Sequence, residues 1–503
     1  MRDADHAATG SSASQLACVL PEDRARQRGQ VTHGAGTPVR RSAWILILTS
    51  MAVVGFVEPC WSQGTVYQAA PGQFVSDCSV AVDQAINAWI KTIPDGTSGN
   101  PSIVKFVAGA CYGLNGSILV GDPNVSDPTP STRRHYLTFD GNGATFKAIT
   151  LADGITVGGT FEPNQNRSNW TVGGGSNITF EHMTIIGFAS PPTPPATWIL
   201  YDISTILDPT TNSVSVDPTK IAKAWDYSYE HGINFAGVQT GLVDDVNISW
   251  VLGNFITASS YGKEVADGHG GWSGTTPTTN LTIQNSSFSF SGLMGVGLTD
   301  IDGFVLRKSY IGHVGGAAVD LELNFNGEVG RNISILDNTF DTIYLSIFSN
   351  AGAGYPGAQG NVTISRNVQT VPLDASGNYN GGFPSCQPVI YVVSPLRTYN
   401  SGFTVTNNQF AVLGDVMYFV RVNNLTVSAN TATWINQWCI PPFAAIRLCD
   451  SRSASVTSNT FTNDPKYLFT TPTPLVRQES LTAGVTTRNN TPSTRTVTPD
   501  CTN

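Results

Sequence analysis

The sequence predicts an all-β solenoid of the parallel β-helix type, and three observations support this prediction. Only 13% of the residues are charged, whereas the chain has 50 Gly and 29 Pro, a composition that favours strands and turns over helices. A nine-residue segment such as NISILDNTF, residues 332–340, recurs along the C-terminal two thirds of the chain. The seventh residue of consecutive copies is Asn, which indicates repeated turns of one kind.

The recurring nonapeptide predicts a short strand that leads into a tight turn. Its second to fourth residues alternate apolar, polar, apolar, which is strand periodicity. A period of 22 residues or slightly more, with extra length in loops, is typical of a solenoid, because no single rung can bury its apolar face alone. The copies begin at Asn247, Asn280, Gly303, Asn332, Asn361, Gly402, Asn424, Ser453 and Gly484.

The asparagines at the seventh position predict a ladder of amide groups. Asn tolerates turn dihedrals, and identical amides stacked at the strand spacing of about 4.8 Å can bond one another. The same repeat explains the Asn-x-Ser/Thr triplets at the start of several copies, which we assign to strand starts and ladders rather than to glycosylation. The seventh-position residues are Asn338, Asn367, Asn408, Asn430, Asn459 and Asn490.

A second strand follows at a constant offset, in segments 295–302, 317–324 and 344–351. Two or three short strands per turn with Asn-rich and Gly-rich corners describe a parallel β-helix. A β-propeller is the alternative architecture, but its blades need about forty residues with four strands each.

Residues 77–93 predict a helix that caps the open end of the stack. An uncovered end would leave strand edges free to pair with other chains. Ser76 or Asp77 is suited to cap this helix at its N-terminus. The apolar residues at helical spacing are Val82, Ala85, Ile86, Trp89 and Ile90.

The first 62 residues are interpreted as a leader and a secretory signal peptide. Arg40 and Arg41 precede an apolar run over 43–57, and Cys60-Trp61-Ser62 supplies small side chains at the positions that a signal peptidase reads. This predicts a secreted, periplasmic or extracellular protein. No later stretch is apolar enough for a transmembrane helix, so no stable membrane span is expected after signal removal.

The remainder is divided into three parts. Residues 63–130 are expected to hold the capping helix and the first coils, and 131–495 the β-helix. An irregular Pro-rich and Thr-rich insert over 189–225 interrupts the β-helix. Residues 496–503 are expected to form a C-terminal tail.

The charge of the chain argues against nucleic acid and anionic membranes as partners. The formal net charge is −9, and it becomes −10 without residues 1–62, which carry six Lys or Arg and five Asp or Glu.

An even number of cysteines beyond the signal peptide predicts disulfide bonds in an exported chain. We expect Cys78 to pair with Cys111 and the remaining cysteines to form a C-terminal set, with free thiols as the alternative. Their spacings are not those of a zinc site. The six candidates are Cys78, Cys111, Cys386, Cys439, Cys449 and Cys501.

The N-terminal segments resemble a known family. The predicted helix is followed by VKFVAGACYGLNGSILV (104–120) and LTFDGNGATF (137–146), and AAVDLELN (317–324) comes later. Over residues 70–490 this order is similar to the pectate-lyase-type, or pectin-lyase-like, right-handed parallel β-helix proteins. The resemblance implies a right-handed helix and a substrate groove on the outer face of a parallel sheet. It leaves function open, because the superfamily includes polysaccharide lyases, glycoside hydrolases, epimerases, phage tailspikes and adhesins.

Asp320 and Glu322 are the main catalytic candidates. The apolar residues around them must point into the coil, so these two carboxyl groups point outward together from backbones about 6.7 Å apart. That separation suits an inverting glycosidase, in which one carboxyl group protonates the leaving oxygen and the other activates water. The separation of about 5–5.5 Å that retaining enzymes need is also reachable through side-chain rotamers. Two alternatives are simple exposure to solvent and a Ca²⁺ site with Asn324 and Asn326. No other cofactor is indicated.

Outward neighbours of this pair on adjacent coils predict a sugar-binding surface. Polar side chains beside an aromatic platform suit a carbohydrate. The candidates are Asn234, Thr299, Ser346, Phe348 and Tyr391.

The loop 263–274 departs from the repeat and is a second source of functional residues. Trp272 is a candidate for stacking on a sugar and Lys263 for binding it, while Asp267 and His269 are candidates for assisting proton transfer. An ordinary Gly-rich loop is the alternative. His231 and His313 are interpreted as turn or ladder residues.

A lyase would need a basic residue beside a uronate. Arg307, Lys308 and Arg331 are the nearby cations, and they do not form the expected basic cluster. The leading hypothesis is therefore an exported enzyme that cleaves or remodels a polysaccharide, most simply by hydrolysis. The alternatives are a non-catalytic carbohydrate-binding or cell-surface β-helix protein and a polysaccharide lyase.

Overall fold

The computed structural model describes most of the chain from residue 64 onward. The chain divides into two compact units, Met1–Cys60 and Trp61–Asn503, and every described residue belongs to the second. The predicted leader and signal peptide therefore lie outside the described residues. The described residues are 64–121, 133–149, 155–157, 160–162, 168–188, 207–208, 213–214, 230–260, 265–266, 272–273, 276–323, 328–341, 345–346, 358–371, 388–394, 398–412, 414–435, 444–463, 475–479, 482–498 and 501.

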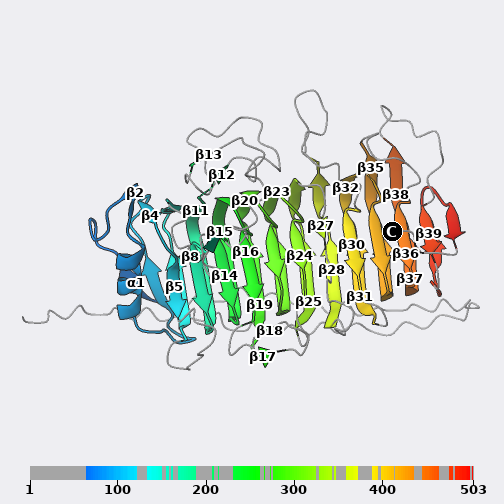
Figure 1. Cartoon of the computed structure of the whole chain (residues 1–503). Helices are drawn as coiled ribbons and strands as arrows, with labels where there is room; N and C mark the ends of the chain where they lie inside the picture. Colours follow the sequence, from blue (N-terminus) through cyan, green and yellow to red (C-terminus); the bar gives the residue numbers. More distant parts are fainter. Residues whose placement is uncertain are drawn as a thin grey trace, which may run out of the picture. The chain divides into compact units, whose positions relative to one another are not determined.

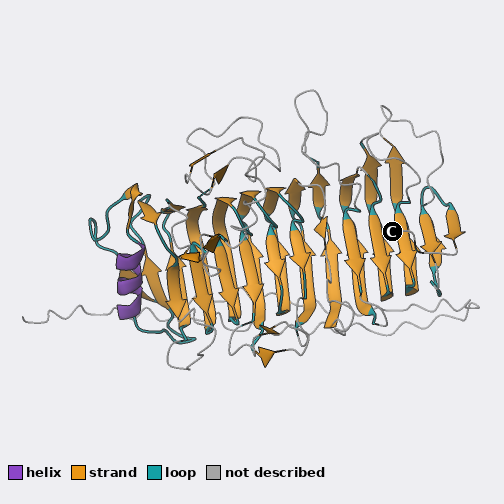
Figure 2. Cartoon of the chain, in the orientation of Figure 1, coloured by secondary structure: helices purple, strands orange, loops and turns teal. Residues whose placement is uncertain are grey.

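Parallel strands stacked in successive coils form the body of the second unit (Figure 1), which confirms the predicted parallel β-helix. Strands dominate it, and α1 (Asp83–Thr92) is the single helix among the described residues (Figure 2). One 23-stranded sheet and two six-stranded sheets make up the coils. The second six-stranded sheet continues the first, because β27 contacts β24.

The two six-stranded sheets form one face of the coil. The first contains β5 (Ile118–Gly121), β10 (Trp170–Gly173), β14 (Ile233–Ala236), β16 (Ile256–Ser259), β21 (Val296–Leu298) and β24 (Val319–Leu321). The second contains β27 (Leu345–Ser346), β30 (Ile390–Val393), β33 (Met417–Val420), β36 (Ile446–Cys449), β39 (Val476–Glu479) and β41 (Arg495–Thr498).

The 23-stranded sheet covers the other two faces, because the long strands β11 (Ser176–Ile186) and β15 (Gln239–Val251) run through the corner between them. The first of these faces also contains β1 (Thr65–Gln68), β3 (Ser102–Lys105), β6 (His135–Asp140), β19 (Thr278–Gln284), β22 (Ile301–Arg307), β25 (Val329–Leu336), β28 (Ala358–Ser365), β31 (Asn400–Thr406), β34 (Val422–Ser428), β37 (Arg452–Thr457) and β40 (Thr486–Arg488). The second also contains β2 (Asp77–Ala81), β4 (Cys111–Leu114), β7 (Thr145–Ala148), β20 (Ser287–Ser291), β23 (Tyr310–Val314), β26 (Thr339–Asp341), β29 (Val368–Thr370), β32 (Gln409–Val412), β35 (Thr431–Trp434) and β38 (Thr460–Asn463).

The nonapeptide covers one bend, a strand, a second bend and the start of the next strand. Asn332 has a φ of 58° at the first bend and Asp337 a φ of 57° at the second. Asn and Asp tolerate this left-handed conformation better than most residues, which explains their recurrence at the bends. Alternate strand residues point inward and build one continuous hydrophobic core.

One copy of the repeat is out of register. The next copy begins at Asn280. Gly241 pairs with Leu281, so the residue of β15 equivalent to Asn280 is Thr240. The predicted start, Asn247, instead pairs with Ser287 on the following face. The prediction failed because β15 continues through the corner without interruption. Apolar and polar residues alternate in both halves of this continuous strand, so the alternation does not show which half begins a repeat.

The predicted asparagine ladder is confirmed. Asn408 Nδ2 donates to Asn430 Oδ1 at 2.9 Å and to the carbonyl of Ile364 at 2.9 Å. Asn408 Oδ1 accepts from the backbone and side-chain amides of Asn367. Equivalent bonds link Asn338 to Asn490 through every predicted member, and all six residues are buried.

The predicted capping helix is present but shorter than expected. Asp77–Ala81 forms β2, and α1 begins at Asp83, so neither Ser76 nor Asp77 caps the helix. Ser76 Oγ instead accepts from the backbone amide of Cys111, and Asp77 Oδ1 from that of Ser79. Residues 77–81 therefore pair as a strand with β4 and do not form the first turn of the helix.

Two disulfide bonds join Cys78 to Cys111 and Cys449 to Cys501. The first is the expected pair, and the second belongs to the expected C-terminal set. Cys386 and Cys439 lie outside the described residues. The predicted C-terminal tail begins as a strand, because β41 pairs with β39.

Three short antiparallel pairs stand apart from the stack in their own sheets. The pair β12 and β13 falls within the predicted insert, and β17 and β18 within the loop 263–274. They comprise β8 (Ile155–Val157), β9 (Thr160–Glu162), β12 (Leu207–Asp208), β13 (Ser213–Val214), β17 (Val265–Ala266) and β18 (Trp272–Ser273). No helix within the described residues is both long and apolar enough to cross a bilayer.

Candidate functional site

One row of side chains on the outer face of the first six-stranded sheet contains Asp320. Strand register aligns Thr171 of β10 with Asn234 of β14, then Thr257 of β16, Gly297 of β21 and Asp320 of β24. We call these five residues the outer row. The residues beside Asp320, Val319 and Leu321, belong to the core, so Asp320 points to the opposite side of the strand.

Asp320 is buried, with 6% of its surface exposed, although it does not point into the core. Simple exposure to solvent, one of the alternatives from the sequence, is therefore wrong for this residue. Burial raises the pKa of Asp320 to about 7, and the negative charge of Glu322 adds to that shift. No hydrogen bond or ion pair to its carboxyl group is found among the described residues.

Glu322 directly follows β24 and lies two residues after Asp320, on the same side of the chain. Its backbone amide donates to the carbonyl of Leu298 at 3.0 Å, and its side chain is half-buried. The neighbour on the coil below is Thr299, whose Oγ1 donates to the carbonyl of Ala258. Two carboxyl groups of unequal burial thus lie near each other on one outer face, an arrangement that separates the acid and base roles.

Asn254 and Gly297 were not predicted from the sequence. A Cβ at Gly297 would lie 2.3 Å from Asn254 Nδ2, so the Asn254 amide fills the space of the missing side chain. Asn254 Nδ2 donates to Thr257 Oγ1 at 3.2 Å, and Oδ1 accepts from the backbone amide of Met294. Asn254 falls inside the misregistered copy of the repeat, which hid its position next to the outer row.

Asp300 is a further acidic residue that the sequence did not single out. It follows β21, is buried, and accepts from the backbone amide of Val329 at 2.9 Å. Burial raises its pKa to about 6 despite that hydrogen bond. Because its oxygen fixes the start of β25, we assign it to the corner between two coils.

Tyr391 lies on the second six-stranded sheet, where it pairs with Ser346. Its ring stacks on Tyr418 with a centroid distance of 5.4 Å, and the Arg447 guanidinium lies 4.0 Å from the centroid of Tyr418. Arg447 donates to Asp415 Oδ2 at 3.1 Å and to Glu479 Oε1 at 3.1 Å. This half of the face therefore carries two stacked tyrosines and an arginine that is paired with two carboxylates.

The structure describes the side chains of only some of the predicted site residues. Lys263, Asp267, His269, Phe348, Asn324 and Asn326 lie outside the described residues. Trp272 is described only as the first residue of β18. The roles proposed for these seven residues, and the Ca²⁺ alternative at Asp320, Glu322, Asn324 and Asn326, remain predictions.

The cations considered for lyase chemistry lie on the 23-stranded sheet or its bends. Arg307 on β22 donates to Gln284 Oε1, and Arg331 on β25 pairs with Asp302 at 2.8 Å. Lys308 occupies a bend with a φ of 51°. None of these three residues is on the sheet that carries Asp320.

Both predicted turn histidines have structural partners. His231 Nδ1 accepts from the backbone amide of Asn254 at 2.9 Å, and burial lowers the pKa of His231 to about 4, so its ring is neutral at pH 7. The ring of His313 stacks on Phe290 at 4.6 Å.

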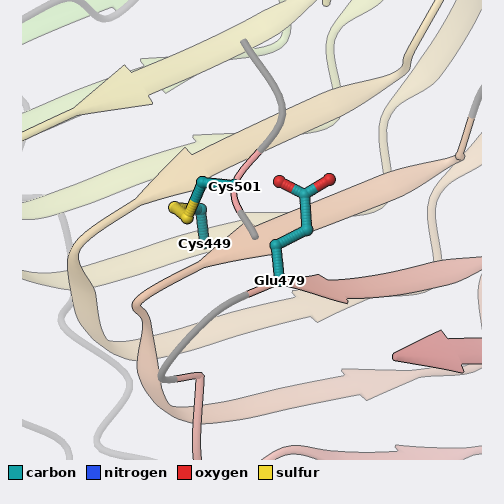
Figure 3. Close-up of side chains that lie close together, drawn as sticks. All are labelled: Cys449, Glu479 and Cys501. Carbon is teal, nitrogen blue, oxygen red and sulfur yellow. A yellow bond between two sulfur atoms is a disulfide. The ribbon is translucent and has the colours of Figure 1, made fainter. Parts of the chain in front are cut away.

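Among the described residues, two groups of side chains have the donor types of a metal site. Asp140, Glu181 and His182 lie together on the outer face of the large sheet, but the Lys105 ammonium already lies 2.7 Å from Asp140. Glu479 lies beside Cys449 and Cys501 (Figure 3). Those cysteines form a disulfide, so they offer no thiolate to a metal.

Comparison with solved structures agrees with the fold. The adhesin PfbA of Streptococcus pneumoniae has a TM-score of 0.51 at 13% identity, over 83% of this chain and 87% of that chain. The A-module of mannuronan C-5 epimerase AlgE6 of Azotobacter vinelandii has a TM-score of 0.48 at 12% identity, over 85% and 96% of the two chains. The endo-xylogalacturonan hydrolase of Aspergillus tubingensis has a TM-score of 0.43 at 12% identity, over 87% and 96%.

At these identities the likeness concerns the fold alone, and the parallel β-helix of this chain agrees with that likeness. No protein-family model matches the chain, and no curated protein matches it.

Proposed function

We propose that this protein is an exported enzyme that hydrolyses glycosidic bonds of a polysaccharide, with Asp320 as the general acid and Glu322 as the general base. The observation that carries the proposal is the Asp320 carboxyl group, which is buried, bears no hydrogen bond among the described residues, and lies beside a second carboxylate. A carboxyl group with a raised pKa, little exposed surface and no hydrogen bond among the described residues is suited to act on a bound substrate.

The raised pKa of Asp320 supports the acid role. With a pKa of about 7, a large fraction of Asp320 is protonated at neutral pH and has a proton to donate. Asp320 would protonate the glycosidic oxygen as its bond to the anomeric carbon breaks. Glu322 would remove a proton from the water that attacks that carbon. Exchange of protons with solvent returns both groups to their starting states.

The spacing is compatible with inversion, and retention is reachable through side-chain rotamers. Residues two apart on a strand have backbones about 6.7 Å apart, and inverting enzymes hold their carboxyl groups about 6.5–9.5 Å apart, which leaves room for a water molecule. Retaining enzymes hold their carboxyl groups about 5–5.5 Å apart.

A panel of glycans tests the proposal. Hydrolysis releases reducing sugar without a new absorbance near 235 nm, whereas β-elimination gives both signals. Asp320→Asn and Glu322→Gln should each abolish most of the activity while the thermal unfolding transition is retained. Full activity in either variant would refute the assignment of these residues.

A non-catalytic carbohydrate-binding surface protein is the second candidate. The adhesin among the similar structures supports it only through the shared fold. Binding of a glycan without any product from the whole panel would favour this candidate.

A further inference from the structure

The two ends of the coil stack are held in different ways. At the N-terminal end, α1 contacts β4 and β5 and buries Ile86 and Ile90. Among the described residues, no helix lies at the C-terminal end, where β41 is the last strand of its sheet and pairs only with β39. A strand edge that nothing covers can fray or pair with another chain, so this end is the weaker one unless another restraint holds it.

The side chains of β41 contribute little to holding it in place. Three of its four residues are exposed, and Val497 has 72% of its surface exposed. Burial of apolar surface stabilises a strand in proportion to the area removed from water. Little such area is buried here, so β41 depends on its backbone ladder with β39 and on any covalent link.

The Cys449–Cys501 disulfide supplies a covalent link at this end. Cys449, Glu479 and Thr498 occupy the same register position on β36, β39 and β41, and Cys501 follows β41. The bond therefore reaches from beyond the last strand of the sheet back across β39 to β36. The two cysteines are 52 residues apart in the sequence, and the strands β37 to β41 lie between them.

Glu479 lies beside this bond. Val476 belongs to the core, so strand alternation directs Glu479 to the outer side of the sheet, yet Glu479 is 0% exposed. Its carboxylate oxygen and the two sulfur atoms all lie within 4.8 Å of one another (Figure 3). Arg447 and Arg477 pair with the same carboxylate at 3.1 and 3.0 Å. The disulfide thus helps to cover a buried ionic group on an outer face.

We propose that the Cys449–Cys501 disulfide is a redox-sensitive clasp on the C-terminal end of the coil stack. In the oxidised protein the clasp holds β41 on β39 and keeps Glu479 covered. Its reduction releases β41 and opens Glu479 to solvent, while the middle of the stack, around β22 and β25, stays folded. This inference does not depend on the proposed hydrolysis.

A dithiol such as dithiothreitol supplies the electrons for the reduction. One of its thiolates attacks a sulfur of the disulfide, which forms a mixed disulfide and releases the other cysteine as a thiolate that takes up a proton. The second thiolate of the reagent attacks the mixed disulfide, releases the second cysteine and leaves the reagent as a cyclic disulfide. Cys449 is 2% exposed and Cys501 is half-buried, so the reagent meets the Cys501 sulfur first.

Hydrogen–deuterium exchange of the full chain, with and without dithiothreitol, tests the clasp. Reduction should speed exchange of the β41 amides at least about tenfold and leave β22 and β25 unchanged. Because Cys386 and Cys439 lie outside the described residues, a variant must assign the effect to one bond. Cys449→Ser combined with Cys501→Ser should exchange like the reduced wild type, and dithiothreitol should cause no further change at β41.

Cys78→Ser combined with Cys111→Ser is the matched control. It removes the disulfide at the other end of the stack, where α1 is also present. In this variant β41 should exchange as slowly as in the oxidised wild type and should still respond to dithiothreitol.

Cleavage by a glutamate-specific protease supplies a second readout. The protease should cut after Glu479 at least about tenfold faster in the reduced wild type than in the oxidised protein, because a buried site is cut only when it opens. Reoxidation with oxidised glutathione should restore the slow rate.

Three outcomes would overturn the inference. Unchanged exchange of β41 in both the reduced wild type and the variant without Cys449 and Cys501 would show that strand pairing alone holds this end. Faster exchange in β22 and β25 as well would show a general loss of stability rather than a local clasp. A response of β41 to dithiothreitol that persists in that variant would assign the effect to other cysteines.

Discussion

The asparagine ladder and the outer row are both lines of residues held in register on successive coils, yet they differ in the pairing of their polar groups. In the ladder, Asn408 makes hydrogen bonds with both neighbouring coils through its oxygen and its nitrogen. In the outer row, Thr171 Oγ1 and Asn234 Oδ1 have no partner, and Asp320 has none among the described residues.

This difference teaches how one architecture separates stability from function. A fully paired buried network holds the coils in register, whereas unpaired buried groups lower stability and persist where another molecule can pair them. The two rows can be distinguished by what a substitution changes: stability for the ladder and activity for the outer row.

The largest expected effect is on activity. Asp320→Asn should lower kcat about 10²-fold to 10⁴-fold, because it removes the proton donor while preserving shape. Reducing-sugar release measures the loss. A decrease of less than tenfold would remove the central distinction between the two rows.

The next largest effect tests a paired group on the functional face itself. Arg447→Met should destabilise the protein by about 3–5 kcal/mol, because it leaves Asp415 without its cation and weakens the pairing of the buried Glu479. Chemical unfolding measures the change. Arg366→Met is the control, since its pair with Asp337 is exposed and should contribute at most about 1 kcal/mol.

The unpaired Asp320 should make stability depend on pH. Its pKa is about 7 in the folded protein and about 3.9 when unfolded, so the folded state retains the proton more strongly. This contribution is fully present below pH 4, is lost as the pH rises to 7, and amounts to at most about 4 kcal/mol. Unfolding of the wild type and of Asp320→Asn between pH 4 and pH 8 should show the variant gaining relative stability over that interval. A difference that does not vary with pH would contradict the raised pKa.

The smallest effect concerns one rung of the ladder. Asn408→Ala should cost about 1–3 kcal/mol, because the amides of Asn367 lose their acceptor inside the protein. The exposed neighbour Gln409, changed to Ala, should alter stability by less than about 0.5 kcal/mol. Similar losses in both variants would indicate that the ladder adds nothing beyond strand propensity.

Much of this architecture could be predicted from the sequence because its signals are local and repeated. The nonapeptide predicted the strands and the bends, and Asn at its seventh position predicted the ladder that Asn338 to Asn490 form. Alternation around Asp320 predicted which residues enter the core, and Val319 and Leu321 do so.

The errors arose where pairing between distant segments overrides a local pattern. The predicted helix start at Asp77 became the strand β2 because β4 offers it a partner, and β15 continues through a corner where the sequence suggests a new repeat. Asn254 and Thr171 were not predicted as site residues, since nothing nearby in the sequence marks them.

The sequence by itself determined the coil and the outward direction of Asp320, because side-chain direction follows from strand alternation within a few residues. Only the tertiary structure decided that Asp320 is buried, that Gly297 and the amide of Asn254 lie next to it, and that Thr171 is in its register. Those properties depend on segments up to 149 positions apart being stacked at one strand spacing after another, and no local pattern specifies that stacking.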